Sequence, residues 1–433
     1  MAKTLYICYF GVHQPLVQTQ VIPYLLEIAK SGIEVSLLTF EPDFKTKWTE
    51  EQIETERKKL AEMGVDWHCL AYHKRFSVIA TAYDVFRGAW FIRHVTGEKN
   101  FDILHGRSHV ATLMGAIARK FSQHKPKLLF DIRGFFPEEY TDAGIWPENG
   151  LVYRIVKRIE KWLMKEADGF VVLTERAREI LFRESTAPSA KFAHPTQNQK
   201  GSFDKIGRPI EVIPCCVDLK RFEFINGSSR AEMRHKLKID DRFVMVYVGS
   251  FGGWYLTKET ADLYGELKKK RDNAFALILT QSKPEVIEPL LRKQGYEAND
   301  FLIKQVLPTE IPSHLRAADA AISFIKPCYS KQSSSPTKNA EYLACGLPII
   351  VNDGIGDTTE FTLTDQTGVV ITEFEGKAYT AALDELFEMM KDGEELADRC
   401  ISSARNRFDL VNVGGEKYRR LYKQLLGKLA VNN

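Results

Sequence analysis

The sequence predicts an α/β protein made of two doubly wound domains, each with a parallel sheet covered by helices. Three observations carry this prediction. Short apolar runs alternate with longer segments of helical period in both halves of the chain. A polar stretch with few apolar residues, 218–241, separates the two sets of runs. At 433 residues, the chain is also too long for one compact core.

Each expected strand is a short apolar run, and each expected helix has apolar residues three and four apart. The expected strands are 4–10, 34–39, 103–105, 128–131, 169–173, 210–214, 243–248, 275–279, 301–304, 320–324, 349–351 and 369–371, and the clearest helices are 21–30, 109–121, 151–165 and 413–429. Residues 185–208 are rich in turn formers and predict a surface loop or a small hairpin. We expect domains at 1–218 and 219–412, with a helix in 413–433 that packs back on the first domain.

Composition excludes several classes of function. The net charge of +3 is too small for general nucleic-acid binding. The seven cysteines are scattered without a CxxC pair, and the ten histidines form no metal-binding motif. No apolar run is long enough to span a bilayer, and the first residues lack a cleavage site for a signal peptide. We therefore expect a cytoplasmic protein that binds neither nucleic acid nor a metal.

Residues 333–348, with the sequence SSSPTKNAEYLACGLP, predict a short helix with marked ends. Ser335 is a favourable N-cap, and Pro336 suits the first helical position, where its missing N–H costs nothing. Gly346 can adopt the left-handed conformation that ends a helix. The segment therefore predicts a helix whose N-terminus follows directly on a serine-rich loop.

Three side chains near the start of this helix, Thr337, Lys338 and Glu341, share one face because they are three and four residues apart. A helix N-terminus attracts phosphate through its free N–H groups, and Lys338 adds a full positive charge. Glu341, one turn deeper, can accept hydrogen bonds from the hydroxyls of a ribose. Such a face suits a nucleoside diphosphate. An ordinary capped helix with a surface Lys–Glu pair is the alternative.

Four segments in order resemble the retaining GT-B glycosyltransferases of family 4. SPTKNAEYLACGLPII resembles their donor-binding segment, and the likeness runs from PLVQTQVIPYL, 15–25, to the helix near Glu385. The other three segments are FVVLTERAREIL (170–181), VIPCCVDLKRF (212–222) and VYVGSFGGWYLTKET (246–260). The resemblance implies two Rossmann-like domains that face each other across a cleft, with the nucleotide held mainly by the second.

The resemblance also implies an activity. Family members transfer a hexosyl unit with retention from a nucleotide sugar to an acceptor hydroxyl, and UDP-glucose is our first choice of donor. The acceptor would be a glycan or a lipid-linked sugar in polysaccharide or glycoconjugate synthesis, and neither cofactor nor metal would be needed. Lys338 and Lys258, with the backbone N–H groups of Ser335 and Thr337 on either side of Pro336, would stabilise the leaving diphosphate. Gly252 and Gly253 would let backbone approach it.

Two departures from the family pattern stand in this second half. Ser333 occupies the position of the first of two family glutamates, which lies near the transferred sugar. Ser250 occupies the position of the family's arginine after the first strand of the second domain. Lys258 is the remaining candidate for the role of that arginine, and the sugar contacts stay open.

The first domain has polar side chains at the carboxyl ends of expected strands, where open α/β sheets bind ligands. His105 and Arg107 follow one strand, and Arg133 follows another that ends in Asp131. We expect His105 and Arg133 to position sugar or acceptor, although a lone histidine is more often a hydrogen-bonded core residue. Gln14, Gln18 and Arg107 are further candidates on the acceptor or sugar side.

Residues 151–165 predict a basic helix with an apolar stripe. We expect this helix to contact anionic lipid on the inner face of a membrane, because family acceptors are often lipid-linked. An ordinary helix with solvated lysines is the alternative.

Two other functions fit the same fold. The first is a non-hydrolysing nucleotide-sugar epimerase, which would use Asp131 or the Glu138–Glu139 pair as acid and base. The second is a non-catalytic subunit that binds a nucleotide sugar, which the serine at position 333 makes conceivable.

Overall fold

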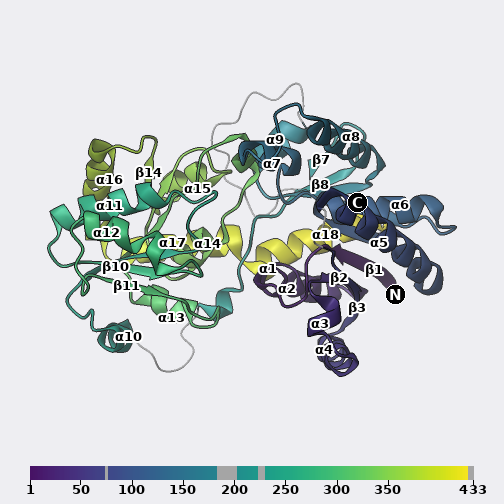
Figure 1. Cartoon of the computed structure of the whole chain (residues 1–433), viewed down its shortest axis with the longest axis horizontal. Coiled ribbons are helices and arrows are strands. Elements are labelled where there is room, and N and C mark those ends of the chain that lie inside the picture. The colour runs from purple at the N-terminus through teal and green to yellow at the C-terminus, as the bar shows by residue number, and fades with distance from the viewer. Residues whose placement is uncertain (74–76, 183–201, 223–229, 428–433) are drawn as a thin grey trace, which may run out of the picture. The chain divides into compact units, whose positions relative to one another are not determined.

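The structure, a computed structural model, describes residues 1–73, 77–182, 202–222 and 230–427. It divides into two compact units (Figure 1). Unit 1 comprises Met1–Pro214 together with the segment from Leu410 onward, and unit 2 comprises Cys215–Asp409. These boundaries lie close to those expected at 218/219 and 412/413. Most of the expected loop or hairpin at 185–208 lies outside the described residues.

Unit 1 is built on one large sheet with the strand order β3-β2-β1-β4-β5-β6-β8-β7. Seven strands run parallel, and the short β7 pairs antiparallel with β8 at the edge. The strands are β1 (Ala2–Cys8), β2 (Ile33–Glu41), β3 (Val65–Ala71), β4 (Ile103–Arg107), β5 (Lys127–Asp131), β6 (Gly169–Val172), β7 (Ser202–Phe203) and β8 (Pro209–Val212). The helices are α1 (Pro15–Gln20), α2 (Ile22–Ala29), α3 (Phe44–Lys47), α4 (Glu50–Glu62), α5 (Ser77–Lys99), α6 (Ser108–Phe121), α7 (Phe136–Asp142), α8 (Leu151–Glu166), α9 (Glu175–Phe182) and α18 (Glu416–Leu425).

Unit 2 has a parallel sheet of six strands in the order β11-β10-β9-β12-β13-β14. The strands are β9 (Phe243–Val248), β10 (Ala274–Leu279), β11 (Phe301–Lys304), β12 (Ala320–Ser323), β13 (Ile349–Asn352) and β14 (Gly368–Ile371). The helices are α10 (Arg230–Leu237), α11 (Thr257–Lys270), α12 (Glu288–Lys293), α13 (Ile311–Arg316), α14 (Thr337–Ala344), α15 (Thr358–Thr364), α16 (Gly376–Met389) and α17 (Glu394–Phe408).

The central strand β9 shows why this sheet needs helices on both faces. Val244 and Val246 belong to one buried apolar cluster, whereas Met245 and Tyr247 belong to another. Successive side chains of a strand point to opposite faces, so both faces of β9 are covered. This burial explains the continuous apolar run FVMVYV that predicts the strand.

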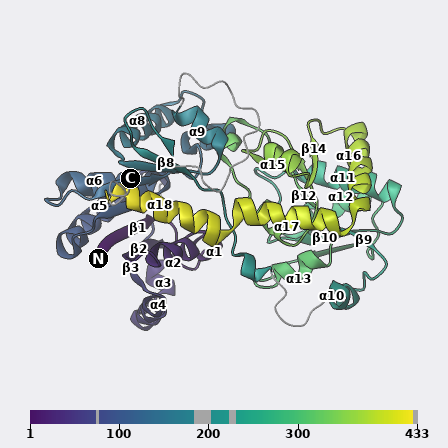
Figure 2. The ribbon, with the colours of Figure 1, turned by 180° about the vertical axis from the view of Figure 1, so that it is seen from behind.

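The C-terminal helix α18 belongs to unit 1, where it packs against β8 and α2 (Figure 2). Tyr418, Leu421, Tyr422 and Leu425 recur every three or four residues and are all buried. This amphipathic spacing lets a short helix bury one face. Since α18 is separated from β8 by the whole of unit 2, the chain leaves unit 1 and returns to it.

Candidate functional site

Helix α14 is positioned at the carboxyl end of β9 by one tyrosine. The Tyr342 hydroxyl accepts a hydrogen bond from Val248 N at 2.7 Å and lies 3.3 Å from the carbonyl oxygen of Ile322 on β12. The helix begins at Thr337 with Pro336 as its N-cap residue, one position later than expected. The Ser335 hydroxyl accepts a hydrogen bond from Cys215 N at 3.1 Å, so this serine ties the loop to the start of unit 2 and does not cap the helix.

Lys338 is buried, with only 8% of its surface exposed. Its ammonium lies 4.4 Å from the ring centroid of Tyr247 and 4.5 Å from that of Tyr255. Within the described part of the chain, no hydrogen-bond acceptor contacts this Nζ atom. Burial lowers the pKa of Lys338 to about 7, although Glu341 opposes the shift. When Lys338 is protonated, its charge is therefore only partly compensated by the site.

Glu341 lies one turn deeper in α14 and is partly buried. Burial raises the pKa of this carboxyl to about 7, against the opposing effects of Arg221 and Lys338. The alternative of an ordinary capped helix with a surface Lys–Glu pair is therefore wrong for Lys338, which is buried. The cause is that α14 packs tightly, since Lys338, Asn339, Ala340, Tyr342 and Leu343 are all buried.

The glycine loop after β9 encloses the same lysine. Gly249 has φ +135°, and a Cβ atom built on it would lie 3.5 Å from Lys338 Nζ. Gly252 and Gly253 also have positive φ values, which favour glycine. Gly252 N donates to the Thr257 hydroxyl at 3.0 Å, so this one N–H is already used inside the loop.

The sequence did not single out the aromatic side chains around this loop. Besides Tyr247 and Tyr255, Trp254 contributes a ring that lies 4.1 Å from the ammonium of Lys331. Lys331 is 7% exposed, so neighbouring residues of one loop cover two buried lysines. The signal available in the sequence is the aromatic cluster of GSFGGWYLTK, which follows a strand directly.

Lys258 does not join this cluster. It lies in the first turn of α11, its side chain is 74% exposed, and its ammonium contacts the Asp262 carboxylate at 2.5 Å. At the two positions that depart from the family pattern, Ser333 is buried and donates to Ser330 O, whereas Ser250 O accepts from the Tyr247 hydroxyl. The second unit therefore brings together Lys338, Glu341, Thr337 and the glycine loop, but not Lys258.

In unit 1, the expected site residues His105, Arg107 and Arg133 surround a buried carboxylate, Asp131. His105 Nδ1 lies 2.8 Å from the Tyr422 hydroxyl, and its Nε2 lies 3.6 Å from Asp131. Arg107 and Arg133 approach the same carboxylate at 3.8 and 3.5 Å. Burial alone would raise the pKa of Asp131, but Arg133, His105 and Arg107 hold it below its usual range.

This cluster has the properties of a structural core. His105 is fully buried, and burial lowers its pKa despite the nearby carboxylate. The Tyr418 hydroxyl donates to Asp131 at 3.1 Å, and the Tyr422 hydroxyl contacts His105. Helix α18 therefore supplies two tyrosines to this cluster. The placement corresponds to the alternative given above for His105, a hydrogen-bonded core histidine, and argues against direct contact between His105 and a substrate.

The two glutamines expected near the acceptor have different surroundings. Gln18 donates from Nε2 to Val12 O at 2.7 Å and so braces the loop after β1. Gln14 lines a cavity of about 960 Å³ in unit 1, together with His13, Trp48 and Glu56 among others. Of the two, Gln14 is the one whose side chain lines open space.

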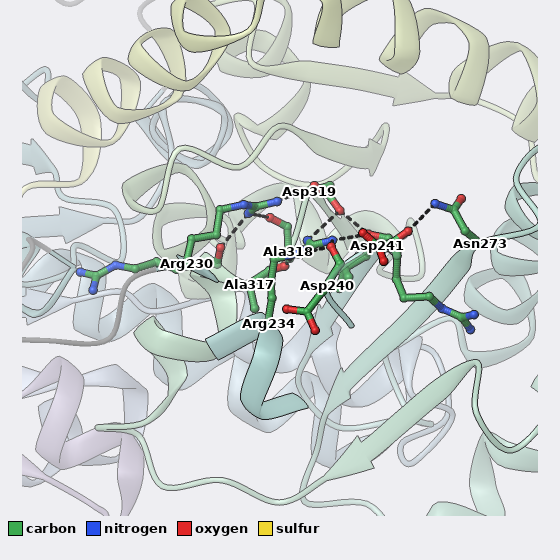
Figure 3. Close-up of polar contacts among 11 residues, drawn as sticks. Arg230, Arg234, Asp240, Asp241, Asn273, Ala317, Ala318 and Asp319 are labelled. Carbon is green, nitrogen blue, oxygen red and sulfur yellow. Dashed lines mark hydrogen bonds and ion pairs between the residues drawn. The ribbon is translucent and has the colours of Figure 1, made fainter. Parts of the chain in front are cut away.

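Two consecutive acidic residues, Asp240 and Asp241, lie in the turn that joins α10 to β9 in unit 2 (Figure 3). Arg234 donates to the backbone carbonyl of Asp240, and Asn273 donates to that of Asp241 at 2.8 Å. The carboxylate at the centre of this network is that of Asp319, which binds Arg230, Arg234 and Val244 N. Over the described ranges, no group of three or more His, Cys, Asp or Glu side chains has a metal-binding arrangement.

Both halves of the sequence match glycosyltransferase families. Residues 18–193 match the glycosyl transferase 4-like domain, and residues 229–407 match the glycosyl transferases group 1 family. No functionally curated protein matches the sequence significantly. None of the helices in the described ranges is long and apolar enough to cross a membrane.

Solved structures share the fold at low sequence identity. A glycosyltransferase from Rickettsia africae is 15% identical with a TM-score of 0.67 and covers 98% of both chains. HepE of Anabaena, solved in complex with UDP and glucose, is 14% identical with a TM-score of 0.63 over 100% of both chains. A putative UDP-N-acetylglucosamine 2-epimerase from Listeria monocytogenes is 13% identical with a TM-score of 0.60, over 98% of this chain and 97% of its own.

Two parallel-sheet units with these matches define a glycosyltransferase of the GT-B fold. The chain belongs to the glycosyltransferases that combine a 4-like first domain with a group 1 second domain.

Proposed function

We propose that this protein transfers a hexosyl unit, with glucose as the first choice, from a UDP-sugar to a hydroxyl of a glycan or lipid-linked acceptor. The observation that carries the proposal is Lys338, a buried ammonium without a hydrogen-bond acceptor among the described residues, in the first turn of α14. A diphosphate would supply the missing negative charge, and Glu341 would accept the ribose hydroxyls. The binding of UDP and glucose by HepE, a protein of similar fold, supports the same choice.

In the proposed reaction, the bond from the anomeric carbon to the diphosphate breaks as the acceptor oxygen bonds to that carbon. Negative charge grows on the leaving diphosphate, where Lys338 and the N–H groups at the start of α14 stabilise it. The acceptor proton passes to a phosphate oxygen of the donor, and the configuration at the anomeric carbon is retained. Such a reaction needs no cofactor, would proceed without a divalent metal, and suits cytoplasmic polysaccharide or glycoconjugate synthesis.

The test is calorimetric titration of UDP against two variants of α14. Glu341→Ala should weaken binding of UDP and of the UDP-sugar alike by about ten- to hundredfold, because the ribose does not change during the reaction. Lys338→Met keeps an unbranched side chain in the buried space and should lower turnover more than binding.

Matched controls come from the same unit. Glu394→Ala removes an exposed glutamate at the start of α17, and Lys258→Ala removes the exposed lysine that the family likeness suggested. Both variants should bind UDP like the parent. Parent-like binding by Glu341→Ala, or a loss confined to Lys258→Ala, would place the donor site elsewhere.

The epimerase alternative is less well supported. Arg133, His105 and Arg107 hold the pKa of the buried Asp131 below its usual range, and the Glu138 carboxylate is engaged by Tyr153 and Lys157, so neither of these two side chains offers a free acid or base. Release of UDP with sugar transfer supports a transferase, whereas formation of an epimerised free nucleotide sugar would support the alternative. Tight binding with no turnover on any acceptor would indicate a binding subunit.

A further inference from the structure

Helix α5 exposes apolar side chains along its first four turns. Ile79, Tyr83, Phe86 and Trp90 are 73%, 51%, 69% and 64% exposed. We call these four residues the α5 stripe. Their spacing of three and four residues places them on one face of the helix. The opposite face is buried through Ala80, Val85, Ala89 and Ile92, and α5 packs there against α6.

Positive charge accompanies the α5 stripe. The Arg87 guanidinium lies 5.7 Å from the ring centroid of Tyr83, and that of Arg93 lies 5.5 Å from Trp90. Arg93 also donates to the carbonyl oxygen of Phe121, the last residue of α6, whose side chain is 67% exposed. The exposed aromatic surface therefore continues onto the neighbouring helix and carries two arginines.

Negative charge is scarce along the α5 stripe. Helix α5 contains two carboxylates, Asp84 and Glu98, and Glu98 lies about two turns beyond Trp90, where it contacts His94. Asp84 is fully buried and bonds the Tyr9 hydroxyl and His73. A partner for the α5 stripe must therefore accept apolar and aromatic side chains and also neutralise arginines.

We propose that the α5 stripe docks on the surface of an anionic lipid bilayer. Aromatic side chains with an apolar body suit the region between headgroups and acyl chains, and anionic headgroups neutralise Arg87 and Arg93. A second copy of this chain fits less well. A two-fold interface centred on the stripe would place the arginines of both copies together, and the segment from Ile79 to Arg93 has no exposed carboxylate to neutralise them.

This inference replaces the expectation that α8 is the lipid-binding helix. The apolar stripe expected on α8 points mainly into unit 1, where Leu163 is buried and Ile159 and Trp162 pack on the core. Lys157 of α8 contacts the carboxylates of Glu138 and Glu160. Only Leu151 and Ile155 of that stripe remain exposed, so α8 has little apolar surface to insert.

The test is sedimentation of the full-length protein with vesicles of phosphatidylcholine, with and without phosphatidylglycerol. At low salt we expect binding only to the anionic vesicles, and roughly tenfold weaker binding at high salt. Phe86→Ser combined with Trp90→Ser should weaken binding at least about tenfold, because two aromatic side chains are lost. The control is Ile206→Ser, since Ile206 is 79% exposed elsewhere in unit 1, and it should bind like the parent.

A second readout locates the contact. Trp90→Phe should keep vesicle binding but lose the blue shift of tryptophan fluorescence that the parent shows with anionic vesicles. Absence of binding at low salt, or binding that survives the Phe86→Ser and Trp90→Ser changes, would overturn the proposal. So would self-association in sedimentation velocity that these changes abolish, because the stripe would then be an interface between copies. The measurement uses neither donor nor acceptor, so its failure leaves the donor-site proposal standing.

Discussion

At the residue scale, Lys338 combines burial with incomplete compensation of charge. The ammonium lies over the rings of two tyrosines, but a cation–π contact stabilises a positive charge much less than a carboxylate would. A bound diphosphate would favour the charged form and raise the pKa of Lys338 from about 7. Ligand binding and protonation of this lysine should therefore be linked.

The linkage gives a pH dependence of UDP affinity. Below pH 7 Lys338 is already protonated when free, so this lysine takes up no proton on binding there. Above pH 7 the free lysine is neutral and must be protonated on binding, so affinity should fall by up to about tenfold for each unit towards pH 9. Titrations in two buffers of different ionisation enthalpy should show the proton uptake.

Lys338→Met is the control for this pH dependence, because methionine does not titrate. Its affinity for UDP should be lower and nearly constant between pH 7 and about pH 9. A parent enzyme whose UDP affinity is equally constant over this range would show that Lys338 does not meet the diphosphate.

The sequence predicted the positions of Lys338 and Glu341 on α14 but not the burial of Lys338. The rings that cover it come from β9 and the loop after that strand, and pairing of distant segments is not visible in a local pattern. His105 illustrates the converse. Its expected place at a strand end suggested a ligand, but β4 extends to Arg107, and its partner Tyr422 lies on a helix near the other end of the chain.

At the element scale, α10 is fastened to the sheet of unit 2 by Asp319. Asp319→Ala should lower the free energy of unfolding by about 2–3 kcal/mol, because Arg230, Arg234 and Val244 N all lose an acceptor. Chemical denaturation measures the change. Asp241→Ala, at an exposed position in the same network whose backbone carbonyl stays in place, should remain within about 0.5 kcal/mol of the parent.

Helix α18 is fastened to unit 1 by the Tyr422 hydroxyl. This group contacts both His105 and Thr4, so Tyr422→Phe should destabilise unit 1 by about 1–3 kcal/mol through loss of a buried partner. Hydrogen exchange of β1 and β4 amides should quicken. Tyr83→Phe, on the exposed face of α5, is the control and should leave exchange unchanged, whereas equal effects of the two changes would contradict this role.

Elements with a continuous apolar run were predicted well, as β9 and β11 show by their matching ends. Strand β3 was not predicted, because its sequence VDWHCLA interrupts the apolar residues with Asp66 and His68. It lies at the edge of the sheet, where partial exposure tolerates polar residues. Helix α5 was not predicted either, since apolar residues on both of its faces obscure the amphipathic period.

At the scale of the whole molecule, the proposed chemistry predicts that sugar transfer does not depend on a divalent metal. Lys338 and the N–H groups of α14 would neutralise the leaving diphosphate, so sugar transfer should survive EDTA with little loss of rate. Rate measurements before and after chelation, with magnesium added back, test this. An absolute requirement for magnesium or manganese would contradict the assignment of the diphosphate to Lys338.

The return of α18 to unit 1 has a consequence for synthesis on the ribosome. The ribosome makes the chain from the N-terminus onward. Thr4, His105 and Asp131 are therefore made long before their partners in the core, Tyr418 and Tyr422. The intervening unit 2, Cys215–Asp409, takes roughly ten to forty seconds to translate. Unit 2 is continuous in sequence and can finish folding first. Until α18 is made, the cluster around Asp131 in unit 1 lacks its tyrosine partners. The part of the protein made first is therefore completed last.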